Sequence, residues 1–559
     1  MLNELTVGSN MLLVALERYA AACLAIQELY ARGEKPHTIN PQFLPRLDTQ
    51  IDLATSLQSK LARAKAAISW SRNYAHTHVT VNDLPPEVLA RVFHLVLSGQ
   101  PCTKRDYHGV DKTMDLMYPA VLSRVCSRWH RIVFSTPTLW THIDLSTSTL
   151  LNQQCLDGLT KLHLSQVGTL LLGVHVFDAR GYEISQLSHG GGIDSRITRS
   201  ITRLASRTSS FNMDGLGAAT PNGYRKVMSA LFQDSTPGTL TNLTISSGHS
   251  NHFYRGTGFL KAKDDPVDYG SIMDLPKEQL ENILEHVSVL RLAGPYLRWT
   301  SRAYHGLVEL RLVGWETINE SDLVGILHSS PGLRIFQLGL RIDNLLSIDT
   351  QVTPVLLRDL EVLIVWQVGC TLLPSLLRWI APGPKPLQFA FRAQEETYMP
   401  NPKVLQLKED SLVSFFLRSR LSKVDGRYAS IISAIDLLGL STGIQELAIS
   451  HTSFDTFPPP EDATVGSTLK CHLRYFQVSH SSVHMEAVLA FVSYPAFTIG
   501  TVVFHNCGLL HRGVHIPDDQ VTRQVEELNA SCPEVRFIIR SREEPYLVHV
   551  ESWDAGVVL

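Results

Sequence analysis

The spacing of hydrophobic and polar positions changes twice along the chain. Up to about residue 75, and again between Asn82 and Leu145, apolar residues recur in steps of three and four, which places them on one side of a helix. From about Leu150 onward they alternate with polar residues in short runs, which is typical of strands. The pattern predicts an α+β multidomain protein, with a helical hairpin over 1–75, a helical module over 80–146, a strand-rich region over 150–545 and an end piece over 546–559.

The first region predicts two helices with coiled-coil spacing. Gly33 and Pro36 end the first helix, and prolines mark the connection to the second. The two apolar seams consist of Leu12, Leu16, Tyr19, Cys23, Ile26 and Tyr30, and of Leu47, Ile51, Ala54, Leu57, Leu61, Ala64 and Ile68. We expect an antiparallel hairpin, or a helix pair docked on the next module, that satisfies its seam within the chain; self-association through the seam is the alternative.

The second region begins with a helix that Asn82 or Asp83 can cap. Pro85 and Pro86 suit its first turn, where a nitrogen has no hydrogen bond to lose, and Glu87 is favoured there by the helix dipole. Its apolar stripe consists of Leu84, Val88, Leu89, Val92, Phe93 and Val96. This stripe predicts that the helix packs against a neighbour.

A second helix is predicted from Tyr118 to Val133. Its apolar positions are Val121, Leu122, Val125, Cys126, Trp129, Ile132 and Val133. The run from Ser135 to Thr138 ends it, and an apolar extended segment follows through Leu139, Trp140, Ile143 and Leu145. Two short amphipathic helices with a tryptophan-bearing tail make a small helical module.

At these residues the chain resembles the F-box, in the F-box-like variety common in mushroom-type fungal families. The resemblance lies in the L-P-x-E opening at Leu84 to Glu87, the block from Val125 to Ile132, and Leu139 with Trp140. Between the two helices, Ser98 to Met117 is longer than the family pattern and predicts an exposed loop. The resemblance implies docking on the Skp-type adaptor of an SCF-type ubiquitin ligase, through a face built from Leu84, Pro85, Glu87, Val88, Leu89, Phe93, Val125 and Trp129.

The strand-rich region shows short apolar runs, several of which lie about 20 to 28 residues apart, as in leucine-rich repeats. The expected strands are 160–165, 241–246, 288–294, 308–314, 334–340, 361–367, 445–451, 474–480, 501–507 and 535–541. Apolar residues at helical spacing precede three of them, at 321–330, 428–440 and 484–494. The region resembles a degenerate leucine-rich-repeat solenoid; a mixed α/β domain with coincidental spacing is the alternative.

Three parts of this region depart from the repeat pattern. Residues near 188–223 and 248–270 are rich in Gly with Ser, Thr or His and predict loop insertions. The end piece, with Tyr546 and Trp553, predicts a last strand that caps the core. Asn506, in the stretch closest to the repeat consensus, is expected to bond backbone groups at a turn.

Charge and cysteine usage limit the choice of partner and compartment. The chain carries 50 Lys+Arg against 53 Asp+Glu and has no dense basic block, so we expect neither nucleic acid nor a membrane as partner. Its 8 cysteines form no C-x-x-C pair, which indicates a reducing compartment. Glu17 and Arg18 interrupt the N-terminal apolar run, so no signal peptide or membrane span is expected, and the protein is predicted to be cytoplasmic or nuclear.

Two esterase-like motifs and two His/Cys pairs are candidates for catalytic or metal sites. His189 to Gly192 and Gly439 to Gly443 match H-G-G-G and G-x-S-x-G, the esterase motifs. That chemistry needs a strand before Ser441 and a helix after it, whereas the pattern predicts the reverse. His505 with Cys507, and Cys471 with His472, are only pairs, and a closed tetrahedral metal site needs four ligands.

The sequence therefore predicts a non-catalytic protein without a cofactor. By resemblance, the F-box-like module would dock the Skp-type adaptor while the repeats hold a substrate protein for ubiquitin transfer by other subunits. The alternative is a scaffold that binds partners through its repeats without any link to ubiquitin. The identity of the bound protein depends on exposed repeat residues whose neighbours only a structure can place.

Overall fold

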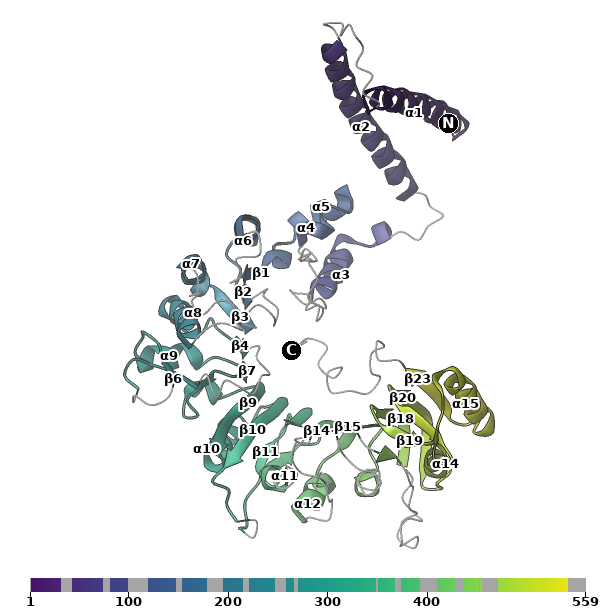
Figure 1. Ribbon diagram of the computed structural model, residues 1–559. Helices are drawn as coiled ribbons and strands as arrows, with labels where there is room; N and C mark the ends of the chain where they lie inside the picture. Colours follow the sequence, from purple (N-terminus) through teal and green to yellow (C-terminus); the bar gives the residue numbers. More distant parts are fainter. Residues whose placement is uncertain are drawn as a thin grey trace. The chain divides into compact units, whose positions relative to one another are not determined.

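The computed structural model of the chain divides into two compact units, Met1–Leu89 and Ala90–Leu559 (Figure 1). It describes residues 2–31, 43–73, 81–98, 119–146, 153–177, 195–214, 221–246, 258–265, 270–347, 350–366, 373–392, 410–427, 437–451, 453–454 and 471–540. The predicted loop at 98–117, the H-G-G-G motif and the end piece after 545 fall outside these residues, except for Ser98. The predicted domain boundaries stay predictions.

The first unit contains the two long helices that the sequence predicts. They are α1 (Leu2–Ala31) and α2 (Phe43–Asn73), followed by the 3-10 turn η1 (Val81–Asp83) and the start of α3 (Pro86–Ser98). The Tyr19 hydroxyl of α1 donates a hydrogen bond to the Gln50 carbonyl of α2 at 3.3 Å. Seam residues such as Leu12 (40% exposed) and Ile51 (63% exposed) remain open to solvent. The expectation that the chain itself buries this seam is therefore wrong for these residues.

Helix α1 also bears on the membrane prediction. Its segment Leu2–Glu28 is long and apolar enough to cross a membrane by length and composition, in spite of Glu17 and Arg18. A signal sequence or a core helix meets the same criterion, so the finding is weak evidence for a membrane span. It differs from the sequence interpretation, and the cellular location stays a prediction.

The helical module after α3 differs in one respect from the prediction. The single helix expected from Tyr118 to Val133 is wrong, because the chain forms α4 (Pro119–Leu122) and α5 (Ser127–Phe134) with a break between them. Cys126 has an extended backbone at the break, and its sulfur accepts a hydrogen bond from the Trp129 N–H at 3.5 Å. A side chain that caps the first turn of α5 in this way separates the two helices.

Among the described residues, the second unit contains a parallel sheet of fourteen strands. In sheet order the strands are β1 (His142–Ser146), β2 (Leu172–Phe177), β3 (Thr208–Asp214), β4 (Asn242–Ser246), β7 (Val289–Ala293), β9 (Glu309–Asn319), β10 (Ile335–Asp343), β12 (Val362–Trp366), β14 (Leu387–Arg392), β15 (Leu421–Arg427), β16 (Glu446–Ser450), β18 (Cys471–Ser479), β20 (Phe497–His505) and β23 (Arg536–Arg540). Because the order follows the chain, each connection returns the chain to the start of the next strand.

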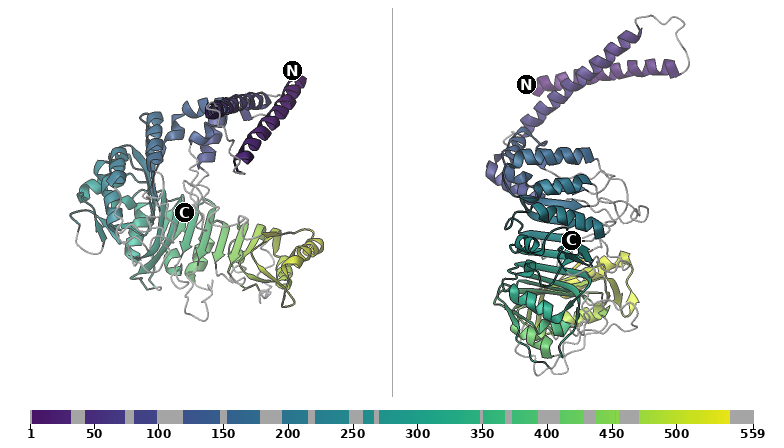
Figure 2. Two further views of the ribbon diagram at one scale, coloured as in Figure 1. Left: turned by 45° about the horizontal axis from the view of Figure 1, so that its top comes forward. Right: turned by 90° about the vertical axis from the view of Figure 1, so that its left-hand side faces the viewer.

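Helices cover one face of this sheet, and the strands line the inner side of the resulting curve (Figures 1 and 2). The helices are α6 (Gln153–Val167), α7 (Ser195–Ala205), α8 (Pro221–Asp234), α9 (Lys277–Leu284), α10 (Glu320–Ser329), α11 (Leu373–Leu377), α12 (Asp410–Arg418), α14 (Met485–Val492) and α15 (Asp518–Ser531). A parallel sheet whose strands alternate with helices on one side is a leucine-rich-repeat-like solenoid. The predicted fold class is confirmed.

Short strands form three smaller sheets between these elements. β11 (Val355–Leu357) pairs with β13 (Ile380–Pro382). The order β6 (Gly270–Ile272), β5 (Phe259–Lys261), β8 (Tyr296–Leu297) makes the second, and β17 (Ser453–Phe454), β19 (Ser482–His484), β21 (Gly508–His511), β22 (Val514–His515) makes the third. Two 3-10 turns, η2 (Pro137–Trp140) and η3 (Arg302–Tyr304), complete the fold.

The hydrophobic core lies between the sheet and its helices. Along each strand every second residue faces the helices, as strand geometry requires. These residues include Leu290, Leu310, Leu312, Phe336, Leu338, Leu363 and Phe389, which are almost completely buried. One repeat alone could not bury this face, so each depends on its neighbours.

Most of the predicted strands are confirmed, and the misses have physical reasons. Thr160–Ser165 is wrong as a strand because it lies within α6, where its leucines occupy helical positions. Strands β2, β3, β14 and β15 were not predicted. The loop insertion near 188–223 is partly wrong, because α7, β3 and the start of α8 lie in it, and that near 248–270 contains β5 and the first residue of β6.

The chain leaves several strands through a residue with left-handed backbone conformation. Asn344, His451, His480 and Asn506 follow β10, β16, β18 and β20 with φ between 47° and 55°. The N–H groups of His451, His480 and Asn506 each donate to the last carbonyl of the next strand in the sheet. The Asn506 side chain lies 2.8 Å from the His480 ring nitrogen, so the expected side-chain bond to a backbone group is replaced by one to an imidazole.

Candidate functional site

The helix α3 divides its apolar residues between two environments. Leu89 and Phe93 are buried, with 0% and 1% exposure. Val88 (44%), Val92 (36%) and Val96 (40%) are spaced four residues apart and therefore form one line along the helix. An exposed line of valines on a short helix is a surface suited to contact with another protein.

Aromatic contacts hold the module together on its buried side. The rings of Phe93 on α3 and Trp129 on α5 lie 4.7 Å apart at an angle of 55°. Such a tilted pair contributes about 0.5–1.5 kcal/mol beyond the buried area. Trp129 is partly buried, so one side of its indole packs in the module and the rest remains accessible.

Trp140 joins the module to the first repeat. Its side chain is completely buried, and its Nε1 donates a hydrogen bond to the Val133 carbonyl at 2.9 Å. Its ring lies 5.1 Å from Phe134 of α5 and 5.1 Å from His163 of α6. Because β1 begins two residues later, the first strand of the solenoid is fixed to the end of the module.

The predicted docking residues are unequally available at the surface. Leu84 (36%), Val88 (44%) and Val125 (59%) are exposed apolar side chains, and Pro85 and Glu87 are also exposed. Leu89 and Phe93 are buried, which favours a role in folding over direct contact. Their assignment to a docking face stays a prediction, as does that of the other six. Leu95, which is 55% exposed on α3, was not singled out from the sequence.

A comparison with known protein families identifies the module. A family model described as F-box-like matches residues 81–146. The chain contains an F-box-like domain. The match covers the module alone, begins within one residue of the predicted start, and gives no information on the source organism. No curated protein matches the chain.

The face of the sheet opposite the helices carries a charged network next to the middle of the solenoid. Arg291 donates from Nε and one terminal nitrogen to the Glu309 carboxylate at 2.6 and 2.8 Å. Arg311 donates to the same carboxylate and to Gln337 Oε1, the latter at 2.9 Å. Burial raises the pKa of Glu309, but the two guanidinium groups outweigh it and hold the pKa below its ordinary value. The carboxylate is therefore ionised at neutral pH.

An apolar cluster follows this network on the same face. Val362, Ile364 and Ala390 are buried, and Ile335 and Trp366 pack against them partly exposed. The Arg392 guanidinium lies over the Trp366 ring, 4.5 Å from its centroid, which is a cation–π contact. Aromatic and arginine side chains together are enriched at protein interfaces. We call this the central cluster, and the sequence signal for it was the apolar residue at every position of 362–365.

The G-x-S-x-G motif and the two His/Cys pairs lie in surroundings that do not favour catalysis or metal binding. Helical residues 437–440 precede Ser441 and β16 follows it, so the order is the reverse of a nucleophile elbow, as expected. Cys471 and His472 are adjacent on β18 and point to opposite faces. The Cys507 thiol donates to the Val478 carbonyl at 3.2 Å, and burial raises the pKa of both thiols to about 11, far from thiolate chemistry at neutral pH.

Proposed function

We propose that this protein is a non-catalytic substrate-recognition adaptor of an SCF-type ubiquitin ligase. The match of residues 81–146 to the F-box-like family supports the proposal most directly, since F-box-like proteins are typically non-catalytic adaptors. The F-box-like domain would dock a Skp-type adaptor, and the repeats would hold the substrate protein. The direct junction through Trp140 fits such a role, because it fixes the position of the first repeat relative to the end of the domain.

The predicted docking surface exposes apolar side chains, as a protein contact requires. Leu84 and Val88 expose more than a third of their area although they are apolar. Exposed apolar side chains near Pro85 and Glu87 can desolvate together on binding, and this is the main source of affinity in protein interfaces. Pro85 immediately precedes α3 and has a restricted backbone, which lowers the entropy lost on docking.

The substrate would contact the face of the sheet opposite the helices. At the central cluster, the partly exposed side chains of Ile335, Trp366 and Arg392 offer apolar and cationic groups to a partner. Such a face accepts a partner that presents an apolar side chain beside an acidic one.

Co-purification of the full chain with its cognate Skp-type adaptor tests the proposal. The double variant Leu84→Ala/Pro85→Ala should lose the complex, because it removes a contact side chain and the rigid helix start without opening the buried core. A matched control is Leu417→Ala/Val514→Ala, which trims exposed apolar residues (65% and 69%) of the repeats and should leave adaptor binding intact. A folded double variant that still binds the adaptor would overturn the assignment of the docking surface.

If a folded wild-type chain forms no complex at all, the scaffold function takes its place. In that case the repeats would bind partners without a link to ubiquitin.

We also infer a cytoplasmic or nuclear location, supported by the free thiols of Cys23, Cys126, Cys471, Cys507 and Cys532. Imaging of a fusion with a fluorescent protein at the C-terminus, with and without residues 2–28, tests this location and any membrane role of α1.

A further inference from the structure

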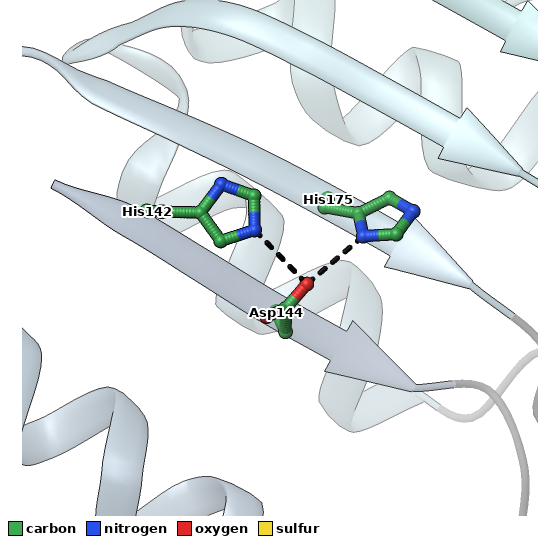
Figure 3. Close-up of side chains that lie close together, drawn as sticks. All are labelled: His142, Asp144 and His175. Carbon is green, nitrogen blue, oxygen red and sulfur yellow. Dashed lines mark hydrogen bonds and ion pairs between the residues drawn. The ribbon is translucent and has the colours of Figure 1, made fainter. Parts of the chain in front are cut away.

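Two imidazole rings on the first two strands of the sheet, those of His142 and His175, point at one carboxylate oxygen of Asp144 (Figure 3). His142 and Asp144 are two residues apart on β1, so their side chains leave the same face of the sheet. His175 lies on β2 directly opposite Asp144, and Gly173 lies opposite His142. Because Gly173 has no side chain, the His142 ring has room to extend toward β2.

The distances suit a shared metal ion. His142 Nε2 lies 3.2 Å and His175 Nδ1 lies 2.9 Å from Asp144 Oδ1. The possible ligand atoms of the three residues all lie within 4.8 Å of one another. Around a tetrahedral zinc ion with bonds of about 2.1 Å, ligand atoms are about 3.4 Å apart. Small side-chain rotations would therefore bring the three atoms onto one ion.

Burial and charge make a cation favourable here. The Asp144 and His175 side chains are only 2% and 6% exposed, whereas that of His142 is 46% exposed. Both imidazole rings lie within hydrogen-bond distance of the buried Asp144 carboxylate. The His142 side chain, which is 46% exposed, offers the route by which an ion would enter.

The donor set indicates which ion fits. Two imidazole nitrogens and one carboxylate oxygen suit Zn²⁺ and its transition-metal neighbours, whereas Mg²⁺ and Ca²⁺ prefer oxygen ligands alone. We propose that His142, Asp144 and His175 bind a zinc-type dication, with water at the remaining coordination position. The ion would tie β1 to β2 and so stabilise the repeat that follows the F-box-like domain.

A hydrogen-bonded triad is the competing explanation. Asp144 Oδ1 can accept a hydrogen bond from each imidazole, and this arrangement needs no metal. The two explanations differ in whether the folded chain takes up one equivalent of zinc at this place. They can be separated without reference to any ubiquitin ligase activity.

Zinc titration of the full chain, stripped of metal with a chelator and followed by calorimetry, provides the test. Wild type should bind one Zn²⁺ per chain. His142→Ala and Asp144→Asn should each lower the zinc affinity by more than about 100-fold, because changing even a residue that only supports a zinc ligand lowers the affinity about 10- to 100-fold. The matched control His472→Ala removes an exposed strand histidine of β18 and should bind as wild type does. Co²⁺ in place of Zn²⁺ should give visible absorption in the wild type and the control alone.

Thermal melting curves show whether a variant that does not bind zinc is still folded. Half-exposed His142 can be replaced with little effect on packing, so metal-free His142→Ala should melt close to metal-free wild type. Added zinc should raise the melting temperature of wild type and His472→Ala and leave His142→Ala unchanged, because a ligand stabilises only the state that binds it. Absence of zinc binding by wild type, or equal binding by all four proteins, would overturn the proposal in favour of the hydrogen-bonded triad.

Discussion

The two faces of the fourteen-stranded sheet are both buried in places, but by different physical means. On the side of the helices, residues such as Leu312 and Phe389 lose contact with water through close apolar packing. On the opposite side, Glu309, Arg311 and Gln337 are also buried, and hydrogen bonds link their side chains. The comparison indicates that apolar packing stabilises the first face, whereas paired charges and hydrogen bonds hold the second face together.

Truncation of a core ring on the helix side should have the largest effect. Phe389 is completely buried and lies 5.7 to 5.9 Å from the rings of Phe391, Phe415 and Phe416. Phe389→Ala should lower the free energy of unfolding by about 3–5 kcal/mol, because it removes apolar contact and leaves a cavity. Urea denaturation followed by circular dichroism measures this change.

Leu417→Ala on neighbouring α12 is the control, since this leucine is 65% exposed. A surface change of this kind should shift stability by no more than about 0.5 kcal/mol. Similar losses in both variants would contradict the assignment of the core to the helix side of the sheet.

Disruption of the charged network should have a smaller effect. Glu309→Gln keeps the shape of the side chain but leaves Arg291 and Arg311 without their shared counter-charge. We expect a loss of about 1–3 kcal/mol, the cost of an imperfectly paired buried polar group. The same denaturation measurement applies, with Glu278→Gln as control because that carboxylate is 74% exposed. If Glu309→Gln leaves the free energy of unfolding unchanged, the paired charges do not stabilise this face of the sheet.

The smallest effect concerns an ion-pair network at the start of the central strands. Hydrogen bonds from Arg334 and Lys385 lower the pKa of Glu361 from 4.5 to about 2. A lowered pKa in the folded state gives stability that is present above pH 4.5 and lost as the pH falls toward 2. Because the three side chains are 31% to 54% exposed, the contribution should be at most about 1 kcal/mol.

The difference in stability between wild type and Glu361→Gln, measured by denaturation at neutral pH and at successively lower pH, checks this expectation. The difference should shrink as the carboxylate is protonated, and it should also shrink in high salt, which screens exposed charges. A difference that stays constant with pH would show that Glu361 acts through packing and not through its charge.

Much of the solenoid could be predicted because its strands repeat a strict alternation. Runs such as Val289–Ala293 and Glu309–Val313 place leucines on one face at the spacing of the repeat, and the structure confirms them as strands. Thr208–Asp214 forms a strand although it contains mostly polar residues, because neighbouring strands on both sides supply its hydrogen bonds. Thr160–Ser165 has the same local alternation as a strand but lies in a helix, because its wider surroundings have helical period.

For the candidate docking site, too, the sequence predicted the local motif but not the exposure of individual side chains. The L-P-x-E opening and the block from Val125 to Ile132 are local signals, and the family match to residues 81–146 confirms the domain that they indicate. Which of those side chains are exposed could not be predicted, because Leu89 and Val88 are adjacent apolar residues with 0% and 44% exposure. Burial depends on what packs against the helix, and a single helical period does not contain that information.

The sequence by itself determined the order of the parts: two long helices, an F-box-like domain, and a repeating alternation of strands and helices. Period and spacing are local properties, and local backbone geometry follows from them. Only the tertiary structure decided which residues meet across strands. Asp144 and His175 are 31 residues apart in the chain and face each other in the sheet, because the parallel pairing of β1 with β2 places them at the same position along the two strands.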